Sequence, residues 1–102
     1  MQKFTQSDFD AFRTVDGFKV CPTGDYTAVK IFGDDCIFGD YSRFGDSCNF
    51  GDYSRFGWNC KFGDSCNFGY SCNFGYSCEF GDNCYKMVKR YPKSKKMVKE
   101  YL

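Results

Sequence analysis

The chain has 102 residues, enough for one domain, and 22% of them are aromatic, which excludes an intrinsically disordered protein. Its formal net charge of +1 is unevenly distributed, because residues 1–85 carry 12 acidic and 7 basic side chains whereas residues 86–102 carry 1 acidic and 7 basic. No apolar run reaches the length of about 18 residues that a membrane-spanning helix needs, and the first residues lack the apolar stretch of a signal peptide, so we expect a cytoplasmic protein with no membrane partner.

Residues 1–31 are expected to form a helix and a lead-in that cap the first end of the fold. A short helix is predicted within residues 5–14, with Ser7 as its N-cap and with Phe9 and Phe12 on one face. Two turn signals follow between apolar stretches. We therefore expect irregular strands that lead into the next segment.

Residues 32–85 repeat every six residues without a slip. Each of the nine units begins with Phe-Gly and has Cys or Ser four residues after the Phe. An α-helix cannot keep a six-residue apolar period on one face, and a Gly in every unit would weaken a helix by roughly 1 kcal/mol each time. A period this short and strict is typical of a solenoid. The repeated phenylalanines are Phe32, Phe38, Phe44, Phe50, Phe56, Phe62, Phe68, Phe74 and Phe80.

The unit Phe-Gly-x-x-(Cys/Ser)-x resembles the hexapeptide-repeat family. That family repeats a bulky apolar residue, a small or acidic residue, two free positions, a small residue and another free position. This chain uses Phe where Ile, Val or Leu is usual. The resemblance implies an all-β solenoid, a left-handed triangular β-helix of about three coils at 32–85. Because a solenoid must cover its open ends, the flanking residues are expected to form short helical caps at both ends, the second at 86–102.

Stacked coils of three hexapeptides would align the phenylalanines in three internal ladders. Cys and Ser, both small, would leave room for three rings in each coil. Burying nine Phe side chains contributes roughly 15–25 kcal/mol before the entropy of ordering is subtracted. Gly after each Phe is expected to supply the unusual backbone angles of a corner.

Seven of the eight cysteines share one phase of the repeat, which predicts small buried fillers of the core. No Cys-x-x-Cys pair is present, so the usual zinc spacing is missing and we expect no metal. Stacked pairs such as Cys66 and Cys84 would lie about 4.8 Å apart, so a disulfide or a metal site is the alternative interpretation.

The chain contains no histidine, and this limits what the resemblance implies about activity. Hexapeptide-repeat acyltransferases use histidine as a general base, and the related carbonic anhydrases use histidine as zinc ligands. The chain also lacks the long loops that build those active sites. We therefore expect a protein that is not an enzyme, with no catalytic residues and no cofactor.

The outward positions are expected to carry any binding. Asp after Gly has two interpretations: it satisfies corner amides by local hydrogen bonds, or it forms columns of like charge that mark a docking surface. A lone Trp among Tyr residues also resembles a protein-binding surface, where such aromatics anchor contacts. The candidate binding residues are Asp40, Asp46, Asp64, Asp82, Trp58, Tyr70, Tyr76 and Tyr53.

The basic tail, residues 86–102, also has two interpretations. Its basic residues could contact the phosphates of nucleic acid, or they could solvate the outer face of a capping helix that begins near Ser94. The candidate basic residues are Lys89, Arg90, Lys93, Lys95, Lys96 and Lys99.

The function expected from these features is non-catalytic protein binding. The partner would be a host protein or a nucleoprotein complex, and one version is a bacterial or phage inhibitor of the DNA-mimic or anti-CRISPR type. The alternatives are nucleic-acid binding through the tail and a structural homo-oligomer.

Overall fold

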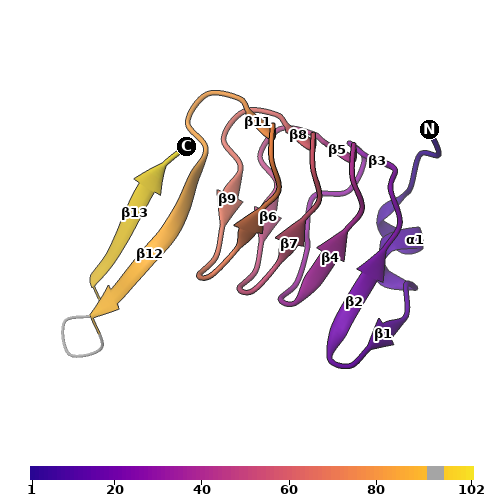
Figure 1. Cartoon of the computed structure of the whole chain (residues 1–102), viewed down its shortest axis with the longest axis horizontal. Coiled ribbons are helices and arrows are strands. Elements are labelled where there is room, and N and C mark those ends of the chain that lie inside the picture. The colour runs from indigo at the N-terminus through magenta and orange to yellow at the C-terminus, as the bar shows by residue number, and fades with distance from the viewer. Residues whose placement is uncertain (92–95) are drawn as a thin grey trace.

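The computed structural model describes residues 1–91 and 96–102, and the side chains outside residues 89–99. This part of the chain is nearly all β, with one short helix (Figure 1). In chain order, the elements are α1 (Gln6–Asp10), β1 (Thr14–Val15), β2 (Phe18–Cys21), β3 (Asp25–Tyr26), β4 (Cys36–Phe38), β5 (Arg43–Phe44), β6 (Asn49–Phe50), β7 (Arg55–Phe56), β8 (Lys61–Phe62), β9 (Asn67–Phe68), β10 (Asn73–Phe74), β11 (Glu79–Phe80), β12 (Tyr85–Tyr91) and β13 (Lys96–Tyr101).

The strands form three sheets, and successive strands of the repeat join successive sheets. The strand orders are β1-β2-β4-β7-β10, β11-β8-β5-β3 and β13-β12-β9-β6. Neighbouring repeat strands are parallel, and the residue opposite Phe38 is Phe56, three hexapeptides further along the chain. The chain therefore winds as a β-solenoid of about four turns, whose rungs lie side by side in Figure 1.

The solenoid has about four turns and not the expected three, because it begins before the first Phe-Gly unit. Strand β2 pairs with β4, and β3 pairs with β5. Tyr26 lies opposite Phe44, is fully buried and stacks on that ring at 5.5 Å between centroids. Tyr26 thus takes the inward position of a phenylalanine, although no glycine follows it.

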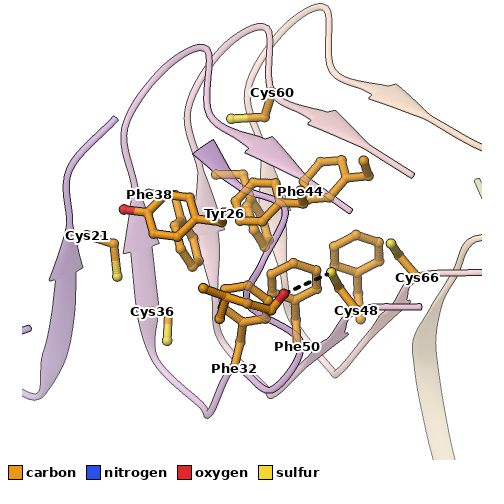
Figure 2. Close-up of a cluster of buried hydrophobic side chains, with 14 of the residues drawn as sticks. Cys21, Tyr26, Phe32, Cys36, Phe38, Phe44, Cys48, Phe50, Cys60 and Cys66 are labelled. Atoms are coloured by element: carbon orange, nitrogen blue, oxygen red, sulfur yellow. Dashed lines mark hydrogen bonds between the residues drawn. The ribbon is translucent and has the colours of Figure 1, made fainter. Parts of the chain in front are cut away.

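The predicted internal ladders are confirmed. Successive rings in one ladder stack nearly in parallel, as for Phe50 and Phe68 with centroids 4.9 Å apart. Within one coil the rings meet edge to face, as for Phe50 and Phe56 at 5.0 Å. Figure 2 shows the rings of Phe32, Phe38, Phe44 and Phe50 between the strands, with cysteines such as Cys48 beside them. Both geometries are the favoured arrangements of aromatic pairs, so three rings per coil fill the prism.

The corners do not use glycine as expected. Among the described glycines only Gly17, in the β1–β2 hairpin, has a positive φ. The left-handed residue of each repeat corner comes three positions after the Phe: Asp35, Tyr41, Ser47, Tyr53, Asn59, Ser65, Ser71, Ser77 and Asn83.

Glycine is needed for another reason, which is the close approach of successive coils. A Cβ on Gly63 would lie 2.7 Å from the carbonyl carbon of Gly45 and would overlap Oδ1 of Asp46. A Cβ on Gly33, in the first unit, would meet no atom within 4 Å. Glycine is therefore required where another coil lies beneath the residue, and not in the first unit.

The first end of the solenoid is covered by residues 1–15. Helix α1 is shorter than expected and its N-cap is Thr5, in a capping box with Asp8, and not Ser7. Phe9 is buried and packs against Phe32 with ring centroids 4.9 Å apart. The described residues at this end thus contain only this one short helix, and the first turn of the solenoid is covered by α1 together with the chain on either side of it.

The expected C-terminal helix is wrong. Residues 85–91 and 96–101 form an antiparallel hairpin, β12–β13. Strand β12 starts by pairing with β9 through Tyr85 and Lys86, so the open edge of β9 favours an extended chain. Within the described residues no helix has the length and apolar character to cross a membrane.

Candidate functional site

The solenoid has three corners, each built from Gly and the two residues after it. The first corner comprises 33–35, 51–53 and 69–71, the second 39–41, 57–59 and 75–77, and the third 45–47, 63–65 and 81–83. Because each coil repeats the same path, the residues in one corner lie directly above one another.

Aspartates at the corners bind the coil above them. Oδ1 of Asp46 accepts a hydrogen bond from the backbone N–H of Asp64 at 2.7 Å, and Oδ1 of Asp64 does the same for Asp82. Charge-assisted bonds of this kind are the stronger ones in proteins. Corresponding bonds of 2.7–2.8 Å join Asp34 to Asp52, Asp40 to Trp58, and Asp52 to Tyr70. Asp therefore binds corner amides, as one of the two interpretations expected. The bonds are not local, because each joins one coil to the next.

Trp58 is the exception to this pattern. It occupies the position after Gly at which the corresponding corners have Asp, and it lies directly below Tyr76. The amide of Tyr76 therefore has no carboxylate beneath it. The indole is 56% exposed and lies 5.9 Å from the Tyr76 ring, which is 79% exposed. Of the six corner amides that stack on a repeat corner within the described residues, five are bound by Asp and this one is not.

The structure divides the predicted binding residues among the corners. Trp58 and Tyr76 share the second corner with Asp40, and Tyr53 and Tyr70 belong to the first corner. The third corner holds Asp46, Asp64 and Asp82 and has no aromatic residue. The aromatic and acidic candidates are thus brought together only in part.

The sheet between the first and second corners is flanked by all of these aromatics. We call strands β4, β7 and β10, together with those two corners, the aromatic face. Its central side chain, Arg55, is exposed and its guanidinium lies 5.1 Å above the ring of Phe18. A shallow hollow of about 310 Å³ lies here, lined by Phe18, Asp35, Tyr53, Arg55, Ser71 and Asn73.

Sequence reasoning missed the part of Phe18 and Arg55 in this hollow. The hexapeptides 39–44 and 51–56 are identical, Gly-Asp-Tyr-Ser-Arg-Phe, so the repeat unit by itself does not distinguish Arg43 from Arg55. In the structure Arg43 lies between Asp25 and Lys61 on its sheet. Arg55 instead lies between Ile37 and Asn73. The β1–β2 hairpin also brings Phe18 beneath Arg55. The turn signal Asp16-Gly17 indicated that hairpin but not its neighbour.

The candidate basic residues of the tail are only partly described. Lys93 and Lys95 lie outside the described residues. The backbone of Lys89 and Arg90 belongs to β12, and that of Lys96 and Lys99 to β13, but their side chains also fall outside the described part.

The cysteines lie in the core, as predicted. Cys78 is partly buried and the other seven are buried, and all eight are free thiols. The thiol of Cys66 donates to the carbonyl of Gly45 at 3.3 Å, and that of Cys84 to Gly63 at 3.1 Å. Burial raises the pKa of Cys60 to about 11. No group of His, Cys, Asp and Glu in the described residues has the arrangement of a metal site.

Comparison of the chain with family models, curated proteins and solved structures gives no match.

Proposed function

We propose that this chain is a non-catalytic solenoid that docks on another protein through its aromatic face. We further propose that its three-sided coil is left-handed, as in the hexapeptide-repeat family that the sequence resembles. Trp58 is the observation that carries the functional proposal.

Trp58 supports binding because it breaks a rule that stabilises the fold. At each of the other five corner positions that lie beneath a described corner amide, an Asp side chain binds that amide. A hydrogen bond to a charged group contributes about 1.5–3 kcal/mol, and Trp58 forgoes it while exposing an indole to water. Residues that depart from local structural rules concentrate at functional sites.

The composition of the aromatic face supports a protein as the partner. Trp, Tyr and Arg are the residue types that most often dominate the energy of protein interfaces. The hollow beside Arg55 is about 310 Å³, at the lower end of the range of small-molecule sites, and it is half open to solvent, which favours an anchoring side chain of a partner protein over a ligand that must be enclosed. Phe18 holds the guanidinium from below, which reduces the entropy lost when a partner binds it.

An inhibitor of a host protein or nucleoprotein complex, of bacterial or phage origin, is the specific form of this proposal. Residues 32–85 carry 8 acidic and 3 basic side chains, a modest excess for a mimic of DNA. In the third corner, Asp46 and Asp64 already hold amides of the next coil. The aromatic face therefore has the larger part in this proposal, and the acidic third corner has the smaller.

The experiment compares proteins captured from host lysate by four immobilised chains: wild type, Trp58→Asp, Arg55→Ala and Arg43→Ala. Arg43→Ala is the matched control, because Arg43 belongs to an identical hexapeptide on another sheet. We expect a protein that wild type and Arg43→Ala retain and that the other two variants lose by about 30-fold, which corresponds to 2 kcal/mol at an interface hot spot. Capture that is equal for all four chains contradicts the proposal.

Nucleic-acid binding through residues 86–102 is the second candidate, favoured by the excess of basic residues there. It predicts a gel shift at low salt that disappears steeply as salt rises and when Lys93, Lys95, Lys96 and Lys99 are changed to Ala. Absence of a shift at low salt contradicts it.

A further inference from the structure

Trp58 and Tyr76 form an open aromatic pair at the second corner. They occupy the same position in adjacent coils. Their ring centroids lie 5.9 Å apart, the ring planes are tilted by 44°, and both side chains are mostly exposed. A cation that is attracted to an aromatic ring lies within about 6 Å of the ring centroid. At this spacing one cation can contact both rings at once.

The cations of the chain lie over other rings. Among the described residues, Lys19 lies over the ring of Phe9 and Arg55 lies over the ring of Phe18. No described lysine or arginine side chain lies over Trp58 or Tyr76. The pair is therefore available to a cation from another molecule.

The aromatic face around this pair is acidic. It contains one basic residue, Arg55, which shares its hollow with Asp35. Asp40 lies directly beneath Trp58, and its Oδ1 accepts a hydrogen bond from the Trp58 amide at 2.7 Å. Within the described residues, no carboxylate of this face forms an ion pair. Four acidic residues and one basic residue give the face a net charge of −3, and the acidic residues are Asp34, Asp35, Asp40 and Asp52.

The sheet on the other side of the second corner does not neutralise this charge. Its facing residues along the stack are Asp25, Arg43, Lys61 and Glu79. Lys61 pairs with Glu79 at 3.8 Å, and Arg43 lies opposite Asp25. The basic residues of that sheet thus have acidic neighbours of their own, and charge complementarity favours a positively charged partner at the aromatic face.

We propose that the aromatic face binds an arginine-containing basic segment of the partner protein, with one guanidinium against the rings of Trp58 and Tyr76 and above Asp40. This inference rests on the proposed docking function and names the chemistry of the partner. Arginine fits better than lysine because its guanidinium is planar, stacks on aromatic faces and is more weakly hydrated. Trp is also the aromatic residue that attracts a cation most strongly.

The first test measures the binding of two short synthetic peptides to the wild-type chain. One alternates glycine with arginine, and the other has citrulline, which is uncharged but has nearly the same shape, in place of each arginine. Trp58 is the only tryptophan of the sequence, so its fluorescence reports on this corner alone. We expect the arginine peptide to bind about tenfold more tightly, because citrulline loses the attraction to two rings and a carboxylate. Equal affinities overturn the inference.

Variants that keep Trp58 separate the attraction to the rings from a general response to charge. Tyr76→Leu keeps an apolar side chain but removes the ring, so it should weaken binding of the arginine peptide about fivefold. Tyr76→Phe should restore most of that affinity, because it restores the ring. Tyr101→Leu is the matched control, since it removes a 68% exposed ring from β13 on the third sheet. Equal effects of Tyr76→Leu and Tyr101→Leu overturn the inference.

A second pair of variants tests the carboxylate. Asp40→Asn keeps an oxygen that can accept from the Trp58 amide but removes the negative charge. It should weaken binding of the arginine peptide about threefold and more than Asp46→Asn does, because the third corner has no aromatic residue. Equal effects of these two variants contradict a guanidinium above Asp40.

Failure of this inference is distinguishable from failure of the docking function. If the two peptides bind equally but Trp58→Asp still loses a protein from host lysate, the aromatic face docks on a partner without an arginine at this corner. If the arginine peptide is preferred but all four chains capture the same proteins, the docking function alone is contradicted.

Discussion

Replacing Trp58 with Asp should stabilise the fold, although it removes the largest aromatic side chain of the surface. The new carboxylate would take the position from which Asp40 and Asp64 bind the amides above them, both at 2.7 Å, and would reach the amide of Tyr76. Such a bond contributes about 1.5–3 kcal/mol. Loss of the contact between the Trp58 and Tyr76 rings costs about 0.5–1.5 kcal/mol. The expected net gain is about 1 kcal/mol in the free energy of unfolding.

Urea denaturation followed by circular dichroism measures this change, and Trp58→Ala is the matched control. The alanine variant also loses the indole but supplies no acceptor, so it should unfold at a lower urea concentration than wild type. The difference between the two variants isolates the hydrogen bond to the amide of Tyr76. If Trp58→Asp unfolds at the same midpoint as Trp58→Ala, corner aspartates do not stabilise the coil above them.

Three further comparisons test the solenoid. Asp46→Ala should lower the free energy of unfolding by about 1.5–3 kcal/mol. Asp82→Ala should change it by less than about 0.5 kcal/mol, because no described amide lies above Asp82. Equal urea midpoints for the two variants would count against the corner bonds. Gly63→Ala should lower the free energy of unfolding by about 1–3 kcal/mol, because the new methyl group overpacks against the coil beneath, whereas Gly33→Ala should leave it unchanged. Equal melting temperatures of the two variants in calorimetry would refute the close approach of the coils. Of the eight thiols in the native protein, Cys78 should react first with a maleimide at pH 8, because the other seven are buried; peptide mapping that finds another cysteine labelled first would contradict the core assignment.

The inward half of the fold could be predicted from the sequence because a six-residue period has one simple solution. Phe at every sixth position, with Cys or Ser four residues later, has to face a common axis. Tyr26 escaped the prediction because it has the right phase but lacks the following glycine. Phase alone, without the strict Phe-Gly pair, would have indicated the additional turn.

The ends of the solenoid were harder to predict because local propensity competes there with the template that a free strand edge offers. Residues 86–101 have helix-forming lysines and an apolar spacing that suits a helix. The open edge of β9 instead pairs with Tyr85 and Lys86, and the extended chain then folds back on itself. Tertiary context of this kind routinely overrides propensity.

The candidate site could be predicted only as a set of exposed residues. Residues 18 apart in the sequence lie above one another, so the sequence assigns each candidate residue to its corner. It gives no distance between corners, so the acidic third corner and the aromatic second corner were equivalent as candidate binding surfaces. The hollow at Arg55 depends on Phe18, which belongs to a hairpin outside the repeat. Nothing in the periodicity of residues 32–85 indicates that neighbour.

Departures from the repeat concentrate on one side of the solenoid. The left-handed corner position is filled by Asp, Asn or Ser in most units, and these residues tolerate a positive φ better than bulky ones do. Tyr41 and Tyr53 adopt φ of 63° at that position, which is strained for an aromatic residue. Both belong to the corners that flank the aromatic face, as does Trp58, while the third corner keeps Ser, Ser and Asn at the left-handed position and Asp beside them. All three costly residues thus lie on one side of a regular coil and none at the third corner, which is the distribution expected under the proposed docking function.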